Sequence, residues 1–252
     1  MNTMKLNSRI AFILGVGCSL IASSSWAAIA LDRTRVIVNE TDKAVSLNIS
    51  NQNKQLPYLA QSWIEDAQGN KITSPLVVLP PVQRVEAGEK SQIKVQVLPA
   101  ANLLARDRET LYYFNLREIP PKSDKPNSLQ IALQTRIKLF YRPAAIVPSR
   151  QDMDNPWQEK LTLTRQGDRY QVNNPTPYYV TLVDASKTKG ATVSGFEPLM
   201  VAPLSSGELN ISASALGDRP ILTYVNDYGG RPALNFKCSG STCQVEPDNS
   251  KK

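Results

Sequence analysis

The stretch SLQIALQTRIKLFYRP, residues 128–143, alternates apolar and polar side chains along nearly its whole length. Successive side chains of a strand point to opposite faces, so this period of two predicts an extended strand, about twice as long as usual. One face of it carries Leu129, Ile131, Leu133, Thr135, Ile137 and Leu139. Such a strand either crosses a large sheet or extends beyond the sheet to which it belongs.

Shorter alternating runs recur along the rest of the chain between Pro, Gly, Asn and Asp residues, and none of them has a sustained helical period. The 18 prolines in 252 residues also disfavour helices. This pattern predicts an all-β protein built of two tandem immunoglobulin-like β-sandwich domains. The expected strands lie at 35–38, 45–49, 58–64, 91–97 and 112–116, and then at 160–164, 170–172, 178–183, 209–211, 221–225 and 233–238.

The N-terminus predicts export from the cytoplasm. Lys5 and Arg9 precede a short apolar core, and Ser25-Trp26-Ala27 is a small-x-small cleavage pattern, as in secretory signal peptides. The core is shorter than the roughly 20 apolar residues of a membrane-spanning helix. The expected organisation is a signal peptide at 1–27, an N-terminal domain at 28–147, a C-terminal domain at 148–252 and a hinge at 144–155.

Charge and cysteine content limit the classes of partner. Removal of residues 1–27 lowers the formal charge from +7 to +5, because this segment carries two basic residues and no acidic ones. The basic residues are spread along the chain, so nucleic acid binding is not expected. In an oxidising compartment, the spacing of Cys238 and Cys243 near a strand end favours a local disulfide across a hairpin over a redox or metal site.

Enzyme chemistry is restricted by the absence of histidine. Ser-His-Asp and Cys-His catalysis are excluded, and we expect neither a metal nor a cofactor. A carbohydrate-acting sandwich enzyme that uses two carboxylates stays open as an alternative. Its candidate acids are Glu65, Asp66, Glu109, Glu118 and Asp227. Scattered acids are usually solvated or paired, so the expectation is that the protein is not an enzyme.

Several segments resemble the periplasmic pilus-assembly chaperones. LARDRETLYYFNLREIPP at 104–121 matches the signature of this family, and the likeness extends over nearly all of the mature chain. The other similar segments are LDRTR, NKQLPYLAQSWIED, PPVQR, LQIALQTRIKLFYRPAAI, NPTPYYV and VNDYGGRP. The resemblance implies a periplasmic protein without enzyme activity, whose two immunoglobulin-like domains form a boomerang with a cleft between them.

The resemblance also implies a role for the long strand. Pilin subunits of this pathway lack their last strand, and the chaperone binds, stabilises and caps them by lending its own strand before delivery to the outer-membrane usher. The residues that match the lent face are Leu129, Ile131, Leu133, Thr135 and Ile137. By pattern alone the same face would belong to an ordinary core strand. An exposed apolar edge also implies a self-capping homodimer of the free chaperone.

Two basic residues match the family's site for the pilin C-terminal carboxylate. They are Arg35 in LDRTR and Lys138 in RIKLF. A guanidinium and an ammonium together offer several charge-assisted donors to one carboxylate, and anchoring the chain end fixes the register of the bound strand. Without the resemblance each would be interpreted as a solvated strand charge.

Three further residues match an interdomain ion-pair network of the family: Glu109, Arg142 and Asp227. Desolvation can cancel the Coulomb attraction of a buried ion pair, so such a network is not expected to add much net stability. Its expected role is to set the angle between the domains. The alternative function is a secreted immunoglobulin-like pilin or adhesin subunit. Two full sets of strands and a mature chain that starts directly with a strand argue against this alternative.

Overall fold

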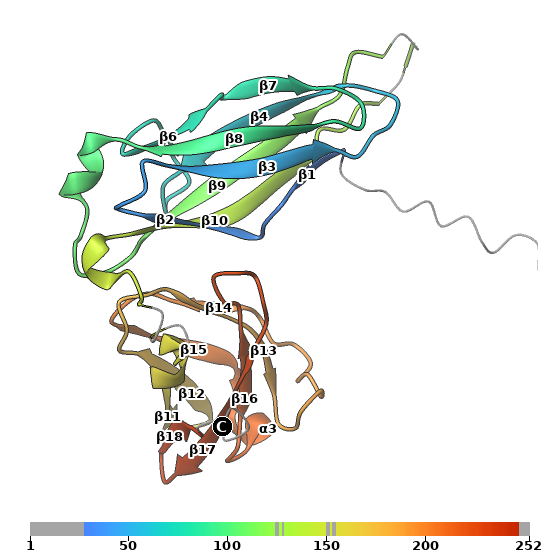
Figure 1. The fold of residues 1–252 in the computed structure, drawn as a ribbon. Helices are drawn as coiled ribbons and strands as arrows, with labels where there is room; N and C mark the ends of the chain where they lie inside the picture. Colours follow the sequence, from blue (N-terminus) through green and yellow to red (C-terminus); the bar gives the residue numbers. More distant parts are fainter. Residues whose placement is uncertain (1–27, 124–125, 128, 150–151, 153–154, 247–252) are drawn as a thin grey trace, which may run out of the picture.

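The computed structural model describes residues 28–123, 126–127, 129–149, 152 and 155–246. The predicted signal peptide lies outside the described residues. Two β-sandwich domains follow each other along the chain, joined at one end and set at an angle (Figure 1). None of the helices in the described part of the chain is long and apolar enough to cross a membrane.

The first domain consists of two packed sheets. One has the order β1 (Ile29–Leu31), β3 (Ala44–Asn51), β8 (Lys90–Val97) and β6 (Leu76–Leu79). The other has the order β2 (Arg35–Asn39), β10 (Gln134–Arg142), β9 (Thr110–Ile119), β4 (Tyr58–Glu65) and β5 (Lys71–Ile72), with β7 (Val82–Val85) also paired to β4. β10 runs antiparallel to β9 and parallel to β2, which places it between them.

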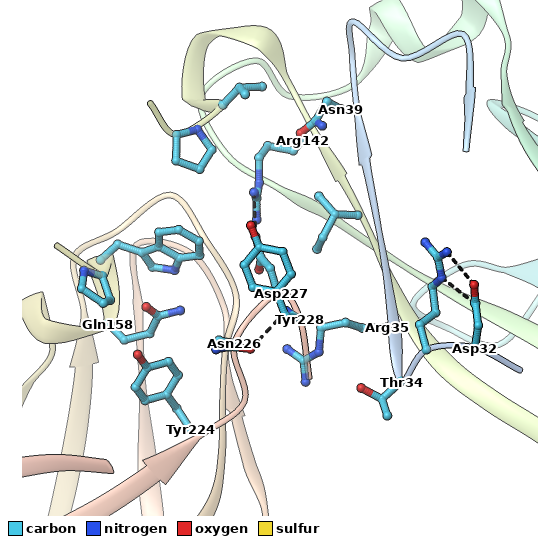
Figure 2. A pocket seen from close by; sticks show the side chains of 16 residues that line it. Asp32, Thr34, Arg35, Asn39, Arg142, Gln158, Tyr224, Asn226, Asp227 and Tyr228 are labelled. Carbon is cyan, nitrogen blue, oxygen red and sulfur yellow. Dashed lines mark hydrogen bonds and ion pairs between the residues drawn. The ribbon is translucent and has the colours of Figure 1, made fainter. Parts of the chain in front are cut away.

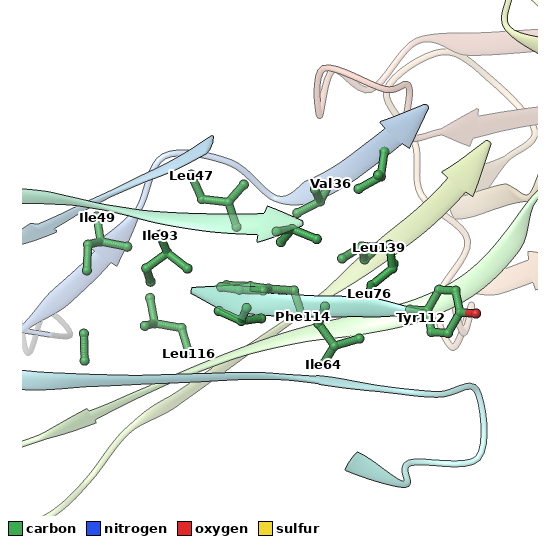
Figure 3. Packing of buried hydrophobic residues seen from close by; sticks show 14 of the residues in the cluster. Val36, Leu47, Ile49, Ile64, Leu76, Ile93, Tyr112, Phe114, Leu116 and Leu139 are labelled. Carbon is green, nitrogen blue, oxygen red and sulfur yellow. The ribbon is translucent and has the colours of Figure 1, made fainter. Parts of the chain in front are cut away.

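The core of the first domain lies between these sheets (Figure 3). Alternate residues of each strand enter it, as the period of two requires. Leu47, Ile49 and Ile93 come from one sheet, and Phe114 and Leu139 come from the other. All five side chains are almost completely buried. β10 therefore contributes core residues only along its second half.

The strands of the second domain form one continuous eight-stranded sheet, which curves round to enclose the core, in the order β14-β13-β16-β17-β18-β11-β12-β15. The bounds are β11 (Thr162–Gln166), β12 (Arg169–Asn174), β13 (Val180–Ser186), β14 (Leu199–Val201), β15 (Ser205–Ser212), β16 (Ile221–Tyr224), β17 (Ala233–Ser239) and β18 (Thr242–Val245). It has its own core, which includes Tyr170, Leu182, Leu222 and Phe236. The short helices are η1 (Pro99–Leu103), η2 (Ala144–Ile146), η3 (Trp157–Lys160) and α3 (Ala213–Leu216).

The expected all-β fold of two sandwiches is confirmed, and each expected strand corresponds to an observed one. Four boundaries were wrong. Lys160 ends helix η3 instead of opening a strand, Tyr178 precedes β13, and Val225 follows the end of β16. The long strand begins only at Gln134. Sequence periodicity missed six short strands: β1, β5, β6, β7, β14 and β18. All six of these strands contain two to four residues, too few to show a clear period.

Cys238 and Cys243 are joined by a disulfide that connects β17 to β18 across their hairpin. The two residues are direct cross-strand partners in the register of the hairpin. This observation confirms the interpretation of the C-x4-C pair as a local disulfide.

Candidate functional site

Residues 129–133 belong to no strand, although their alternation continues that of β10. Leu129, Ile131 and Leu133 expose 87%, 63% and 43% of their surfaces. Strand β9 ends at Ile119, and its last main-chain contact in this region runs from the Glu118 N–H to the Leu133 carbonyl, at 3.0 Å. The predicted long strand is thus divided, because no neighbouring strand continues alongside its first half.

The remaining two expected donor residues lie within β10. Thr135 and Ile137 are half-buried, and Ile137 packs against the core of the first domain. We refer to residues 129–137 as the donor segment. The exposed fraction of this apolar face therefore decreases along the donor segment, and from Leu139 onward the same face of β10 is buried in the core of the first domain.

One edge of the donor segment is open. β10 pairs with β9 along 134–141 but with β2 only along 138–142, because β2 begins at Arg35. The main-chain groups of residues 134–137 on the β2 side therefore have no strand partner in the part of the chain that the structure describes. An unpaired edge beside an exposed apolar face is a template for another strand.

Arg35 and Lys138 are direct neighbours in the parallel pairing of β2 and β10. Arg35 donates from Nη1 to the Val225 carbonyl of the second domain at 2.9 Å, while its buried Nε has no hydrogen-bond partner among the described residues. Burial lowers the pKa of Arg35, against the opposing attraction of Asp227 and Glu109. Burial, and then the charge of Arg35, lower the pKa of Lys138. Two partly desolvated cations side by side favour the binding of an anion.

Arg142 bridges the two domains. It lies in β10 and donates to Glu109 Oε1 from Nε at 2.9 Å and from Nη2 at 2.7 Å. Its Nη1 donates to Asp227 Oδ2 of the second domain at 2.9 Å (Figure 2). The other Glu109 oxygen accepts from the Tyr179 N–H at 2.8 Å. The structure thus brings together Glu109, Arg142 and Asp227 from three distant parts of the chain.

The Glu109–Arg142 pair is deeply buried, with side chains that are 2% and 4% exposed. Burial raises the pKa of Glu109 to about 7, although Arg142 opposes this shift. Burial lowers the pKa of Arg142, but the attraction of Glu109 and Asp227 outweighs this effect, so the pKa of Arg142 is raised. Such a pair is better suited to fixing geometry than to adding net stability.

A cleft of about 510 Å³ lies between the two domains, next to Arg35 and Arg142. Arg35, Arg142 and Asp227 line it, together with Trp157 and Tyr228 (Figure 2). Sequence reasoning missed the second-domain groups that meet the first domain here. These are the Val225 carbonyl, the Tyr179 N–H and the Tyr179 ring, which stacks on Phe140 with ring centroids 5.5 Å apart. The only local signal for them was their position within NPTPYYV and VNDYGGRP.

Four of the five acids of the enzyme alternative have side-chain partners, and the fifth, Glu118, accepts from the main-chain N–H of Ile29. Glu65 accepts from Trp63 Nε1 at 2.7 Å and from Arg136 Nε at 2.9 Å. Asp66 accepts from Asn70 within its own turn, and Glu109 shares Arg142 with Asp227. Across the described residues, no cluster of three or more His, Cys, Asp or Glu could hold a metal ion. No pair of free carboxylates faces the cleft in the described part of the chain.

Comparisons with known proteins show the family of the chain. Residues 28–147 match the family described as "Pili and flagellar-assembly chaperone, PapD N-terminal domain". Residues 156–236 match "Pili assembly chaperone PapD, C-terminal domain". The chain is 53% identical to the probable fimbrial chaperone YfcS of Escherichia coli K12, over 96% of this chain and 95% of the relative. It is 49% identical to the chaperone protein PapD of Escherichia coli, over 90% and 94% of the two chains.

Solved structures show the same arrangement. The periplasmic chaperone SfaE superposes with a TM-score of 0.66 at 32% identity, covering 82% of this chain and 98% of SfaE. A chain of the Salmonella enterica SafA pilin–SafB chaperone complex superposes with a TM-score of 0.69 at 26% identity, covering 86% and 99%. Fold and sequence together define a pilus-assembly chaperone of two immunoglobulin-like domains. The chain belongs to the PapD-like pili assembly chaperone family.

Proposed function

We propose that this protein is a periplasmic chaperone that binds, stabilises and caps pilin subunits by lending them its donor segment. The observation that carries this proposal is the exposed alternating face of Leu129, Ile131 and Leu133 beside the open edge of β10. Three aliphatic side chains buried in a pilin groove would contribute roughly 1.5–3 kcal/mol each before association costs are deducted. The solved complex of the related SafB chaperone with the SafA pilin supports a pilin as partner.

The pairing of β2 indicates how a pilin strand would lie. β2 runs parallel to β10 and begins at Arg35, which is the register partner of Lys138. A pilin strand on the open edge of residues 130–137 would lie in line with β2 and end at this position. If it also runs parallel to β10, its C-terminal carboxylate reaches Arg35 and Lys138. Anchoring the chain end there would set the register, since a slip by one residue turns every apolar side chain out of the groove.

The wider role follows from the family. We infer that the capped subunit is delivered to the outer-membrane usher, in the periplasm, and that neither nucleic acid nor a cofactor takes part. The exchange of noncovalent strand contacts requires no catalytic group, so we also infer that the protein is not an enzyme. The Glu109–Arg142–Asp227 network would hold the cleft open at the angle that a subunit needs.

Co-expression with a pilin subunit in a periplasm tests the proposed function. We expect a soluble one-to-one complex with this chain, and aggregated or degraded pilin without it, because the open groove is an aggregation site. The matched control is a pilin whose groove is already filled by a fused donor strand. This control should not be captured. Equal capture of both pilins, or of neither, would refute strand donation.

The free chaperone is expected to self-associate reversibly through its donor segments. Sedimentation equilibrium of the mature protein should show a concentration-dependent homodimer, because an exposed apolar edge favours edge-to-edge pairing. Addition of a pilin should convert the dimer to the chaperone–pilin complex. A dimer that persists unchanged in Ile131→Glu would place the contact elsewhere on the surface.

Binding of a pilin C-terminal peptide is expected to weaken as pH rises through the alkaline range. The pKa of Lys138 is lowered from 10.5 by burial and by Arg35, so this ammonium loses its proton at a lower pH than an ordinary lysine. Binding of a carboxylate favours the protonated form, and the affinity therefore falls as pH rises through the lowered pKa. Fluorescence titrations over this range would measure the effect.

Two controls separate this effect from general alkaline weakening. A C-terminally amidated peptide should show a flat pH profile, because it lacks the carboxylate. Lys138→Arg should also be flat, since a guanidinium keeps its charge over this range. An unchanged slope in Lys138→Arg would show that another group titrates.

A further inference from the structure

Glu118 is a buried carboxylate for which the described part of the chain provides no cation. Its residue is 6% exposed, and none of the ion pairs among the described residues includes it. Among the described residues, its side chain accepts a hydrogen bond from the Ile29 N–H to Oε2 at 2.8 Å. A carboxylate can accept about four hydrogen bonds, and a buried charge without a partner is costly. The function proposed above does not use this group.

Glu118 lies beside the first residues that follow the predicted cleavage site. Ile29 is the second residue after the predicted cleavage site, so the nitrogen of Ala28 lies one residue from the nitrogen that Glu118 already binds. One residue spans less than about 3.8 Å. Ala28 itself is 8% exposed, and its carbonyl accepts from the Gln52 N–H at 2.6 Å. The Ala28 nitrogen is therefore held near the carboxylate by ordered structure.

We propose that removal of residues 1–27 creates the missing partner: the α-ammonium of Ala28 forms an ion pair with the Glu118 carboxylate. In the uncleaved chain the Ala28 nitrogen is a neutral amide with one N–H. After cleavage it becomes an ammonium with three N–H donors and a positive charge. The site thus recognises the amino terminus of its own chain, and the first domain reaches full stability only once it has been processed.

The ion pair would also stabilise the part of β9 to which Leu133 of the donor segment is hydrogen-bonded. Glu118 joins the two sheets of the first domain, since it lies on β9 and binds the start of β1. The Glu118 N–H holds the Leu133 carbonyl at 3.0 Å, where the chain leaves the sheet. An unpaired Glu118 would therefore loosen the end of β9 that anchors Leu133.

A double-mutant cycle tests the proposal without any pilin. Chains that begin at Ala28 or at Ser25 are each prepared with Glu118 and with Glu118→Gln, and their thermal midpoints are measured. The Ser25 start moves the ammonium by up to about 10 Å. With Glu118, we expect this extension to lower the midpoint by about 2–4 °C, the shift that about 1 kcal/mol produces in a chain of this size. With Glu118→Gln, the extension should have almost no effect, whereas a purely steric effect would remain.

Equal losses in both backgrounds, or no loss in either, would overturn the proposal. Glu89→Gln, an exposed acid at the end of the turn before β8, serves as the matched control and should keep the full effect of the extension. A crystal structure of the mature chain gives an independent answer if Glu118→Gln does not fold. The Ala28 nitrogen should lie within about 4 Å of a Glu118 oxygen, and a longer distance would refute the ion pair.

Discussion

Ile131→Glu and Leu133→Glu are expected to leave the free protein folded and to abolish capture of a pilin subunit. Both side chains are exposed in the free protein, at 63% and 43%, and neither belongs to the core cluster of the first domain. Surface substitutions of this kind usually change stability by less than about 0.5 kcal/mol. The thermal midpoint should therefore stay close to that of the wild type.

The affinity for a pilin subunit should decrease far more than the stability, because the introduced carboxylate would have to enter a desolvated groove. Burial of an unpaired charge costs several kcal/mol, and each 1.4 kcal/mol is a factor of about ten in affinity. We expect a loss of at least about 100-fold in pilin binding, measured by surface plasmon resonance or by pull-down of refolding subunits.

Ala132→Glu is the matched control, since this residue is exposed in the same segment but lies on the opposite face of the alternation. It should retain capture. If Ile131→Glu fails to fold, the face belongs to the first domain's own core, as the pattern alone suggested. If Ala132→Glu loses capture as well, the segment does not act by presenting alternate side chains to a groove.

The second large effect concerns the terminal carboxylate of the pilin. Lys138→Ala and Arg35→Ala should each weaken binding of a pilin C-terminal peptide by about 10- to 150-fold. This range corresponds to roughly 1.5–3 kcal/mol for a hydrogen bond to a charged group. Amidation of the peptide should weaken binding to the wild type strongly and to Lys138→Ala hardly at all. Equal weakening in both proteins would show that Lys138 does not contact the carboxylate.

The two variants should differ in stability. Lys138 forms no ion pair or hydrogen bond with the described residues and lies beside Arg35, so Lys138→Ala removes a partly desolvated like charge. We expect its thermal midpoint to stay unchanged or to rise. Arg35→Ala loses the bond to the Val225 carbonyl, so its midpoint should fall slightly. Lys90→Ala, on the exposed face of β8, controls for the general loss of positive charge and should bind as the wild type does.

Much of the fold was accessible from local pattern. Short alternating runs located the longer strands of both sandwiches, and the alternation of the long strand marked Leu129, Ile131 and Leu133 as one apolar face. The hairpin disulfide followed from the spacing of Cys238 and Cys243. The six strands that escaped notice each have two to four residues, and so few positions seldom show a clear period.

The sequence by itself determined the sandwich class, the apolar face of the donor segment and the hairpin disulfide, because these depend on residues close together along the chain. Only the tertiary structure decided where the long strand divides, since that depends on where β2 begins and β9 ends. It also decided that Arg35 meets Lys138 and that Arg142 reaches Asp227. The hydrogen bond from the Ile29 N–H to Glu118 is likewise a contact that only the tertiary structure shows. These contacts join residues far apart in sequence, and their existence depends on strand register and domain angle, which no local periodicity encodes.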